Sequence, residues 1–168
     1  MKDSISKRVA TMGLLMALAI ALSYLEYLIP TQGILPPGVK LGISNILTMY
    51  CLYFWSFNYA ASIVIFKSLF SLITRGLTAA LIGLAGGFFS ILIMGLMLLV
   101  RKKASTTFVS IIGAISHNMG QLIAARFLLG SNVFFVYVPI LAISGVVMGS
   151  LTAFIYRLTK PYLTRLKP

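Results

Sequence analysis

Acidic and metal-binding side chains are almost absent from this sequence. Its 168 residues include only two carboxylates (Asp3 and Glu26), one His and one Cys. A single Cys excludes an intramolecular disulfide framework, and so few carboxylates leave little material for a metal site or an acid/base pair. The patterns GxxxxGK[ST], GxSxG and HExxH are also missing. We therefore expect no metal, no cofactor and no enzymatic activity.

Charged residues of any kind are scarce as well. They make up 10% of the chain, whereas 60% is hydrophobic and the mean hydropathy is +1.02. An ordinary soluble domain has about 25% charged residues, and a disordered chain has low hydrophobicity, so both classes are excluded. The net charge of +12 is typical of nucleic-acid binders, but here Lys and Arg lie between long apolar runs and form no solvated basic face. We expect a polytopic membrane protein that binds no nucleic acid.

Six apolar runs approach the length of about 20 residues that a transmembrane helix needs. We expect one all-α membrane domain over residues 1–168, with transmembrane helices at about 9–29, 39–55, 59–74, 78–100, 107–129 and 134–156. Pro161 is expected to end any continuation of the last helix.

The positions of Lys and Arg predict the orientation, since short cytoplasmic loops carry an excess of both. If the N-terminus is cytoplasmic, ten of the fourteen cations fall on the inner side: Lys2, Lys7, Arg8, Arg101, Lys102, Lys103, Arg157, Lys160, Arg165 and Lys167. We therefore expect both termini in the cytoplasm, and the segment 30–38 and the turns near 75–78 and 130 on the outer side.

Four cations remain in the outer half of the predicted bundle or at its midplane. These are Lys40, Lys67, Arg75 and Arg126, opposed by Glu26 alone. A charge at the bilayer centre costs about 2.5–3.5 kcal/mol on insertion scales and normally faces the bundle interior or a wet cavity. Because Lys67 lies deepest, we expect it to contact a solute or an ion. In the structural alternative, Glu26 pairs with one cation and the others extend to the interface, and for Lys40 and Arg75 the two interpretations carry equal weight.

Polar residues accompany these cations on three predicted helices. Helical spacing places polar side chains beside Lys40 and Lys67, and His117 and Gln121 share a face of the fifth helix. Arg126 points nearly opposite His117, which makes it a candidate ion-pair partner of Glu26. A net cationic polar site that opens outward suits an anionic solute, although the same groups could instead bond across helices. The candidate solute-binding residues are Lys40, Asn45, Lys67, Arg75, His117, Asn118 and Gln121.

Small residues recur at every fourth position in three of the runs. They are Gly13, Ala17 and Ala21 in the first, Gly83 and Gly87 in the fourth, and Gly145, Gly149 and Ala153 in the sixth. Such spacing lets helix backbones approach closely. For the fourth and sixth helices we expect packing inside the bundle.

Three strings carry a family resemblance: PPGVKLGISNI at 36–46, LAGGFFS at 84–90 and GAISHNMGQL at 113–122. With them the chain resembles, over nearly its whole length, the heptaprenyl diphosphate synthase component I family, also called the Gx transporter family. That family is similar to the S components of energy-coupling factor (ECF) transporters. The resemblance implies a six-helix protein of the bacterial plasma membrane that binds a solute from outside. It also implies a transmembrane coupling subunit and cytoplasmic ATPases as partners.

The resemblance assigns roles to two parts of the chain. Ala17 and Ala21, continued by Gly13, match the small-residue stripe that contacts the coupling subunit in S components. The segment 30–38 occupies the place of the loop that covers the substrate. Flavin nucleotides and isoprenoid-like anions are the candidate solutes that the resemblance suggests.

The synthase in the family's label conflicts with the residues. Prenyl diphosphate synthases hold Mg²⁺ with Asp-rich DDxxD motifs, since Mg²⁺ prefers carboxylates, but the only Asp here is Asp3. Our first hypothesis is therefore an S component that captures an anionic, partly apolar small solute. A non-catalytic membrane accessory of heptaprenyl diphosphate or quinone synthesis is the second hypothesis, and a free-standing solute carrier is the third.

Overall fold

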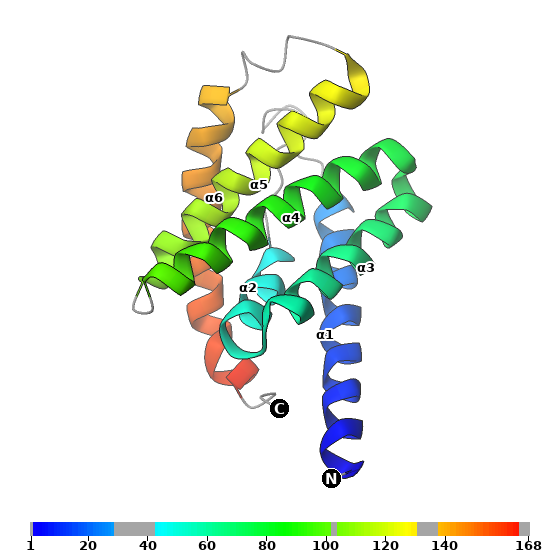
Figure 1. The fold of residues 1–168 in the computed structure, drawn as a ribbon, viewed down its shortest axis with the longest axis vertical. Coiled ribbons are helices and arrows are strands. Elements are labelled where there is room, and N and C mark those ends of the chain that lie inside the picture. Colours follow the sequence, from blue (N-terminus) through cyan, green and yellow to red (C-terminus); the bar gives the residue numbers. More distant parts are fainter. Residues whose placement is uncertain (1, 29–42, 102–103, 131–137, 165–168) are drawn as a thin grey trace.

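The chain folds entirely into helices over the part that the computed structural model describes, which is residues 2–28, 43–101, 104–130 and 138–164. The six helices of this part are α1 (Lys2–Leu28), α2 (Asn45–Phe54), α3 (Phe57–Arg75), α4 (Leu77–Val100), α5 (Thr106–Leu129) and α6 (Val138–Leu163) (Figure 1). The predicted all-α class is confirmed.

Five of the described helices, all except α2, are long and apolar enough to cross a membrane. Their outer surfaces are hydrophobic. More than four-fifths of the residue surface is exposed at Ile73, Val100 and Phe127. Such a surface suits lipid rather than water. The predicted orientation stays a prediction, but the N-terminal end of α1 and the C-terminal end of α6 lie toward the same end of the molecule (Figure 1).

Helix α2 is shorter than the predicted span 39–55. It has ten residues, or about 15 Å of helix, against a hydrocarbon core of about 30 Å. Residues 39–42 lie outside the described part, and Ile43 and Ser44 form a turn. At the other end Ser56 is extended and precedes α3, so residues 55–56 connect the two helices, where the predicted spans leave 56–58 between them. The described part of α2 is therefore a short helix enclosed by its neighbours.

The expectation that Pro161 ends the last helix is wrong. Helix α6 continues through Pro161 to Leu163. A proline removes one backbone hydrogen bond and crowds the preceding turn. At the very end of a helix this disturbs little, because only two helical residues follow. The predicted start of this helix, 134–137, lies outside the described part.

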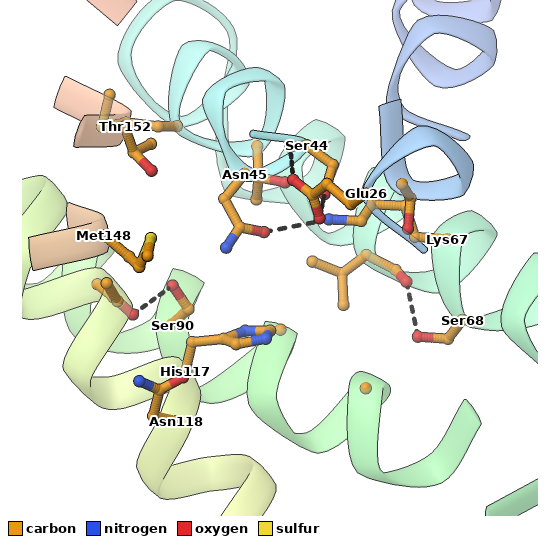
Figure 2. A pocket seen from close by; sticks show the side chains of 18 of the residues that line it. Glu26, Ser44, Asn45, Lys67, Ser68, Ser90, His117, Asn118, Met148 and Thr152 are labelled. Carbon is orange, nitrogen blue, oxygen red and sulfur yellow. Dashed lines mark hydrogen bonds between the residues drawn. The ribbon is translucent and has the colours of Figure 1, made fainter. Parts of the chain in front are cut away.

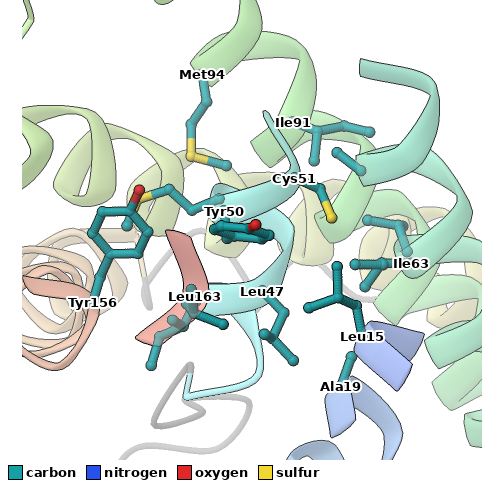
Figure 3. Packing of buried hydrophobic residues seen from close by; sticks show 14 of the residues in the cluster. Leu15, Ala19, Leu47, Tyr50, Cys51, Ile63, Ile91, Met94, Tyr156 and Leu163 are labelled. Carbon is teal, nitrogen blue, oxygen red and sulfur yellow. The ribbon is translucent and has the colours of Figure 1, made fainter. Parts of the chain in front are cut away.

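The core gathers around α2, which contacts α1, α3, α4 and α6. Its residues 46–51 form an uninterrupted buried run. Figure 3 shows Leu47, Tyr50 and Cys51 of this helix packed among side chains of the surrounding helices, with Leu15 and Ala19 reaching in from α1. Cys51 is a packing residue, as its apolar neighbours in the sequence predict.

Glycines let α6 approach α5 closely. A Cβ at Gly149 would lie 2.5 Å from Cα of Ile111, and one at Gly145 would lie 2.8 Å from Cγ1 of Ile115. The prediction of internal packing is confirmed at both positions, and also at Gly87, where a Cβ would meet Val64 of α3. It is wrong for Gly83, because a Cβ there would meet nothing within 4 Å.

Candidate functional site

A cavity lies inside the bundle, and all six helices line it. Its volume is about 70 Å³, enough for a few water molecules or a small solute. Most of the described lining residues have polar side chains, although the protein around the cavity is largely apolar. The only charged groups among the described lining residues are Glu26, Lys67 and Arg75, which sum to +1.

Lys67 is the charged residue that lies farthest from the ends of its apolar helix. It lies near the middle of α3, and its Nζ donates a hydrogen bond to Oδ1 of Asn45 at 3.1 Å (Figure 2). Asn45 opens α2, so this bond joins two helices at the cavity wall. The bond leaves Nζ with further donor capacity, since an ammonium carries three donors.

Glu26 joins α1 to the start of α2. Its carboxylate accepts a hydrogen bond of 2.7 Å from the backbone N–H of Ser44 and a longer one of 3.4 Å from the Ser44 hydroxyl. Ser44 directly precedes α2, where unpaired N–H groups and the helix dipole favour a negative charge. Glu26 also interacts electrostatically with Lys67. The carboxylate thus compensates part of the positive field at this end of the cavity.

Arg75 supplies the second cation of the wall. It ends α3, its guanidinium lies 5.2 Å from the centre of the Tyr27 ring, and its positive charge repels that of Lys67. The Nε atom of Arg75 is enclosed, and no hydrogen-bond acceptor reaches it from the described residues. Arg75, which lines the cavity, therefore carries a buried donor without a partner among the described residues.

Helix α5 contributes His117 and Asn118 on the opposite wall (Figure 2). Asn118 donates from Nδ2 to the carbonyl of Leu141 at 3.0 Å, so part of its amide ties α5 to α6. Next to it, the Ser90 hydroxyl donates to the carbonyl of Gly113 at 2.9 Å. This wall combines helix–helix bonds with groups that face the cavity.

The small-residue stripe of α1 faces away from the core. Gly13, Ala17 and Ala21 are all exposed, whereas Leu15 and Ala19 between them are buried. A Cβ on Gly13 would meet no atom within 4 Å. The stripe is therefore open to a partner or to lipid and takes no part in packing within the described protein.

The family model described as heptaprenyl diphosphate synthase component I matches residues 15–159. The chain belongs to this family. No curated protein and no solved structure matched the chain. The match confirms the resemblance drawn from the three sequence strings, and it extends from the middle of α1 into α6.

The component I label names one part of a synthase, which implies protein partners. Within the described ranges of this component I protein, no group of three or more His, Cys, Asp or Glu side chains could hold a metal ion. The cavity likewise offers a single carboxylate, Glu26, whose two oxygens already accept bonds from Ser44.

Five of the seven predicted solute-binding residues line one cavity: Asn45, Lys67, Arg75, His117 and Asn118. Lys40 lies outside the described residues. Gln121 is buried but is not among the described residues that line the cavity; its side chain packs against Gly86 of α4. Arg126 lies in the last turn of α5, and its pairing with Glu26 stays a prediction.

Sequence reasoning missed the methionines of this cavity. Met49, Met94 and Met148 line it together with Thr48 and Thr152. Thr48 is one of the polar side chains that helical spacing places beside Lys40, whereas Thr152 was missed. The methionines gave no signal, since nothing in their sequence context separates them from core methionines.

Proposed function

We propose that this component I protein is the solute-binding S component of an ECF-type transporter, and that it captures a small anion from the outer side of the membrane. The observation that carries this proposal is Lys67, a cation in the middle of a membrane helix that faces a polar cavity. Such a charge is costly in a bilayer and normally marks a solute or ion path.

The polar wall supports an anionic solute. Two cations, Lys67 and Arg75, line the cavity with one carboxylate, that of Glu26. The buried Nε of Arg75 has no hydrogen-bond acceptor among the described residues. His117 and Asn118 add hydrogen-bonding groups from α5. The cavity volume of about 70 Å³ favours a compact anion, since drug-sized ligands occupy pockets of about 300–1,000 Å³. A flavin nucleotide or an isoprenoid diphosphate would require the bundle to open.

The proposal assigns ATP hydrolysis and coupling to other chains. The sequence has no nucleotide-binding P-loop, so we propose that this subunit is no enzyme and works with a transmembrane coupling subunit and cytoplasmic ATPases. The exposed stripe of Gly13, Ala17 and Ala21 is the proposed contact, since small residues let a partner helix approach closely. Movement of the bundle against that partner would carry the solute inward.

The test is ligand binding by the purified full-length protein. We would screen flavin mononucleotide, isopentenyl diphosphate, inorganic diphosphate and short carboxylates by thermal shift, where a ligand at 100 times its Kd stabilises by about 2.7 kcal/mol. We expect at least one anion to raise the Tm of the native protein, and Lys67→Met to abolish the rise. Arg157→Met is the matched control, because Arg157 bonds Thr107 and is absent from the described cavity lining. A native protein that no anion stabilises would contradict the proposal, as would a Lys67→Met variant that binds normally.

The family's description favours a second candidate function, a membrane accessory of prenyl diphosphate synthesis. Co-purification separates the two. An S component should retain the ATPase and coupling subunits from its native membrane, whereas a synthase accessory should retain a soluble prenyl synthase and leave anion uptake unchanged when it is deleted.

A further inference from the structure

Thr48 carries a buried hydroxyl that the described protein leaves unsatisfied. Its side chain is 3% exposed and lines the cavity, and its Oγ1 has no hydrogen-bond partner among the described residues. A buried hydroxyl without a partner is costly, and this cost is avoidable here.

Other hydroxyls in the same helical bundle avoid that cost locally. Ser62, Ser68 and Thr74 of α3 each donate to the backbone carbonyl four residues earlier, at 2.9–3.0 Å. This bond is available to Ser and Thr throughout helices. Thr48 does not form this bond, and its side chain lines the cavity.

The surroundings of Thr48 differ from those of Asn45 one turn earlier. Asn45 meets the ammonium of Lys67, whereas Thr48 is followed by Met49 and shares the cavity wall with Met94. The two positions are three residues apart on one helix face, about 4.5 Å along the axis. The wall that Thr48 shares with Met94 also carries Ser90 and Ser110, but their hydroxyls already donate to backbone carbonyls, at 2.9 and 2.8 Å. The Thr48 hydroxyl has no such partner among the described residues and lies one turn beyond the cationic group.

We infer that Thr48 binds the uncharged end of the solute, whose anionic group lies at Lys67. The inference rests on the proposed function and narrows its substrate class to a small anion with a hydroxyl or carbonyl group at the opposite end. A short hydroxy acid or oxo acid meets both conditions, and its size suits a cavity of about 70 Å³. The Thr48 hydroxyl can donate to such a group or accept from it.

The experiment compares 4-hydroxybutyrate with butyrate, which share the carboxylate and differ in the distal hydroxyl. Both are titrated by thermal shift against the full-length protein in detergent. We expect the native protein to bind 4-hydroxybutyrate about tenfold more tightly, in line with one added hydrogen bond. Thr48→Val should bind both acids equally, and Thr48→Ser should restore the preference. Thr74→Val is the matched control, because the Thr74 hydroxyl already bonds the carbonyl of Phe70.

A second readout needs no ligand. Because Thr48→Val removes an unsatisfied hydroxyl at nearly constant volume, it should raise the Tm of the ligand-free protein by about 2–4 °C. A fall in Tm would show that the hydroxyl is already satisfied, and would overturn the inference.

The outcomes separate this inference from the proposed function. Equal binding of the two acids by the native protein, or a preference that survives Thr48→Val, overturns the role of Thr48 and leaves the anion site standing. If neither acid binds while another anion stabilises the protein through Lys67, the hydroxy-acid class is wrong and the transporter proposal stands. If no anion binds at all, both are wrong.

Discussion

Glu26 holds a position at the cavity that an anionic solute would compete for. Its carboxylate faces the start of α2 and acts on Lys67, the same groups that an incoming anion would meet. The site therefore contains a negative charge, Glu26, that partly neutralises its two cations. This arrangement keeps a buried lysine compensated when no solute is bound.

Replacing Glu26 by Gln should strengthen anion binding and weaken the fold. The change keeps the size of the side chain and raises the charge of the described wall from +1 to +2. We expect anion affinity to rise about tenfold, or ~1.4 kcal/mol, and the unfolding free energy to fall by about 1 kcal/mol, because a charge-assisted bond to Ser44 becomes a neutral one. Titration and thermal denaturation measure the two effects. Weaker anion binding would show instead that Glu26 holds the solute directly.

At this scale the sequence predicted the charged groups of the wall and the neutral Asn45, His117 and Asn118, but not the methionines. Lys67 and Arg75 stood out because ionised groups inside apolar runs are rare and expensive. Helical spacing placed Thr48 beside Lys40, but a helical Thr can bond its own backbone, and only the structure shows that this one does not. Gln121 was misplaced for a related reason, since a shared helix face cannot say which neighbouring helix covers each turn.

At the scale of the helices, two small-residue patterns that look alike in the sequence have opposite environments. Gly149 lies against the backbone of α5, whereas Gly13 has open space around it. Gly149→Ala should therefore destabilise the protein by about 1–3 kcal/mol through overpacking, and Gly13→Ala should raise the Tm slightly, because Ala favours a helix over Gly by up to about 1 kcal/mol. Thermal denaturation of the pair checks this, and a loss of stability in Gly13→Ala would place α1 against the bundle by that face.

The exposed small-residue stripe of α1 is the proposed contact with the coupling subunit, and this role can be tested. Ala17→Trp fills a surface that the described protein leaves open, so it should preserve the Tm and solute binding but cut co-purification of the coupling subunit and ATPases severalfold. Ile73→Trp is the control, because that side chain is 84% exposed on α3 and lies off the stripe. Equal recovery of the partners with both variants would remove the stripe from the interface.

Helix existence was predictable throughout, while helix ends were not. Apolar runs between polar breaks located all six helices, because lipid and core both select such runs. The start of α2 depends on the carboxylate of Glu26, eighteen residues before Ser44, and no local pattern encodes that. The extension of α6 through Pro161 likewise depends on position within the helix, which the proline rule alone does not contain.

At the scale of the whole molecule, charge distribution predicts orientation. Ten of the fourteen cations lie on the predicted inner side, where anionic lipid adds to the bias. We expect an impermeant maleimide to label Thr78→Cys but not Ser105→Cys on intact cells, and both after lysis. Both positions are exposed, whereas native Cys51 is buried and adds little background. The reverse labelling pattern would show that the protein has the opposite orientation in the membrane.

The methionines of the cavity wall give the molecule a compliant interior. Met49 and Met94 are almost fully buried, and Met148 joins them from α6. A methionine has three rotatable bonds and a polarisable sulfur, so it refills space by changing rotamer with little backbone movement. The size of the chamber is therefore adjustable by side chains as well as by helices. Replacing these residues with rigid, β-branched ones would turn an adaptable receptor into one of fixed shape.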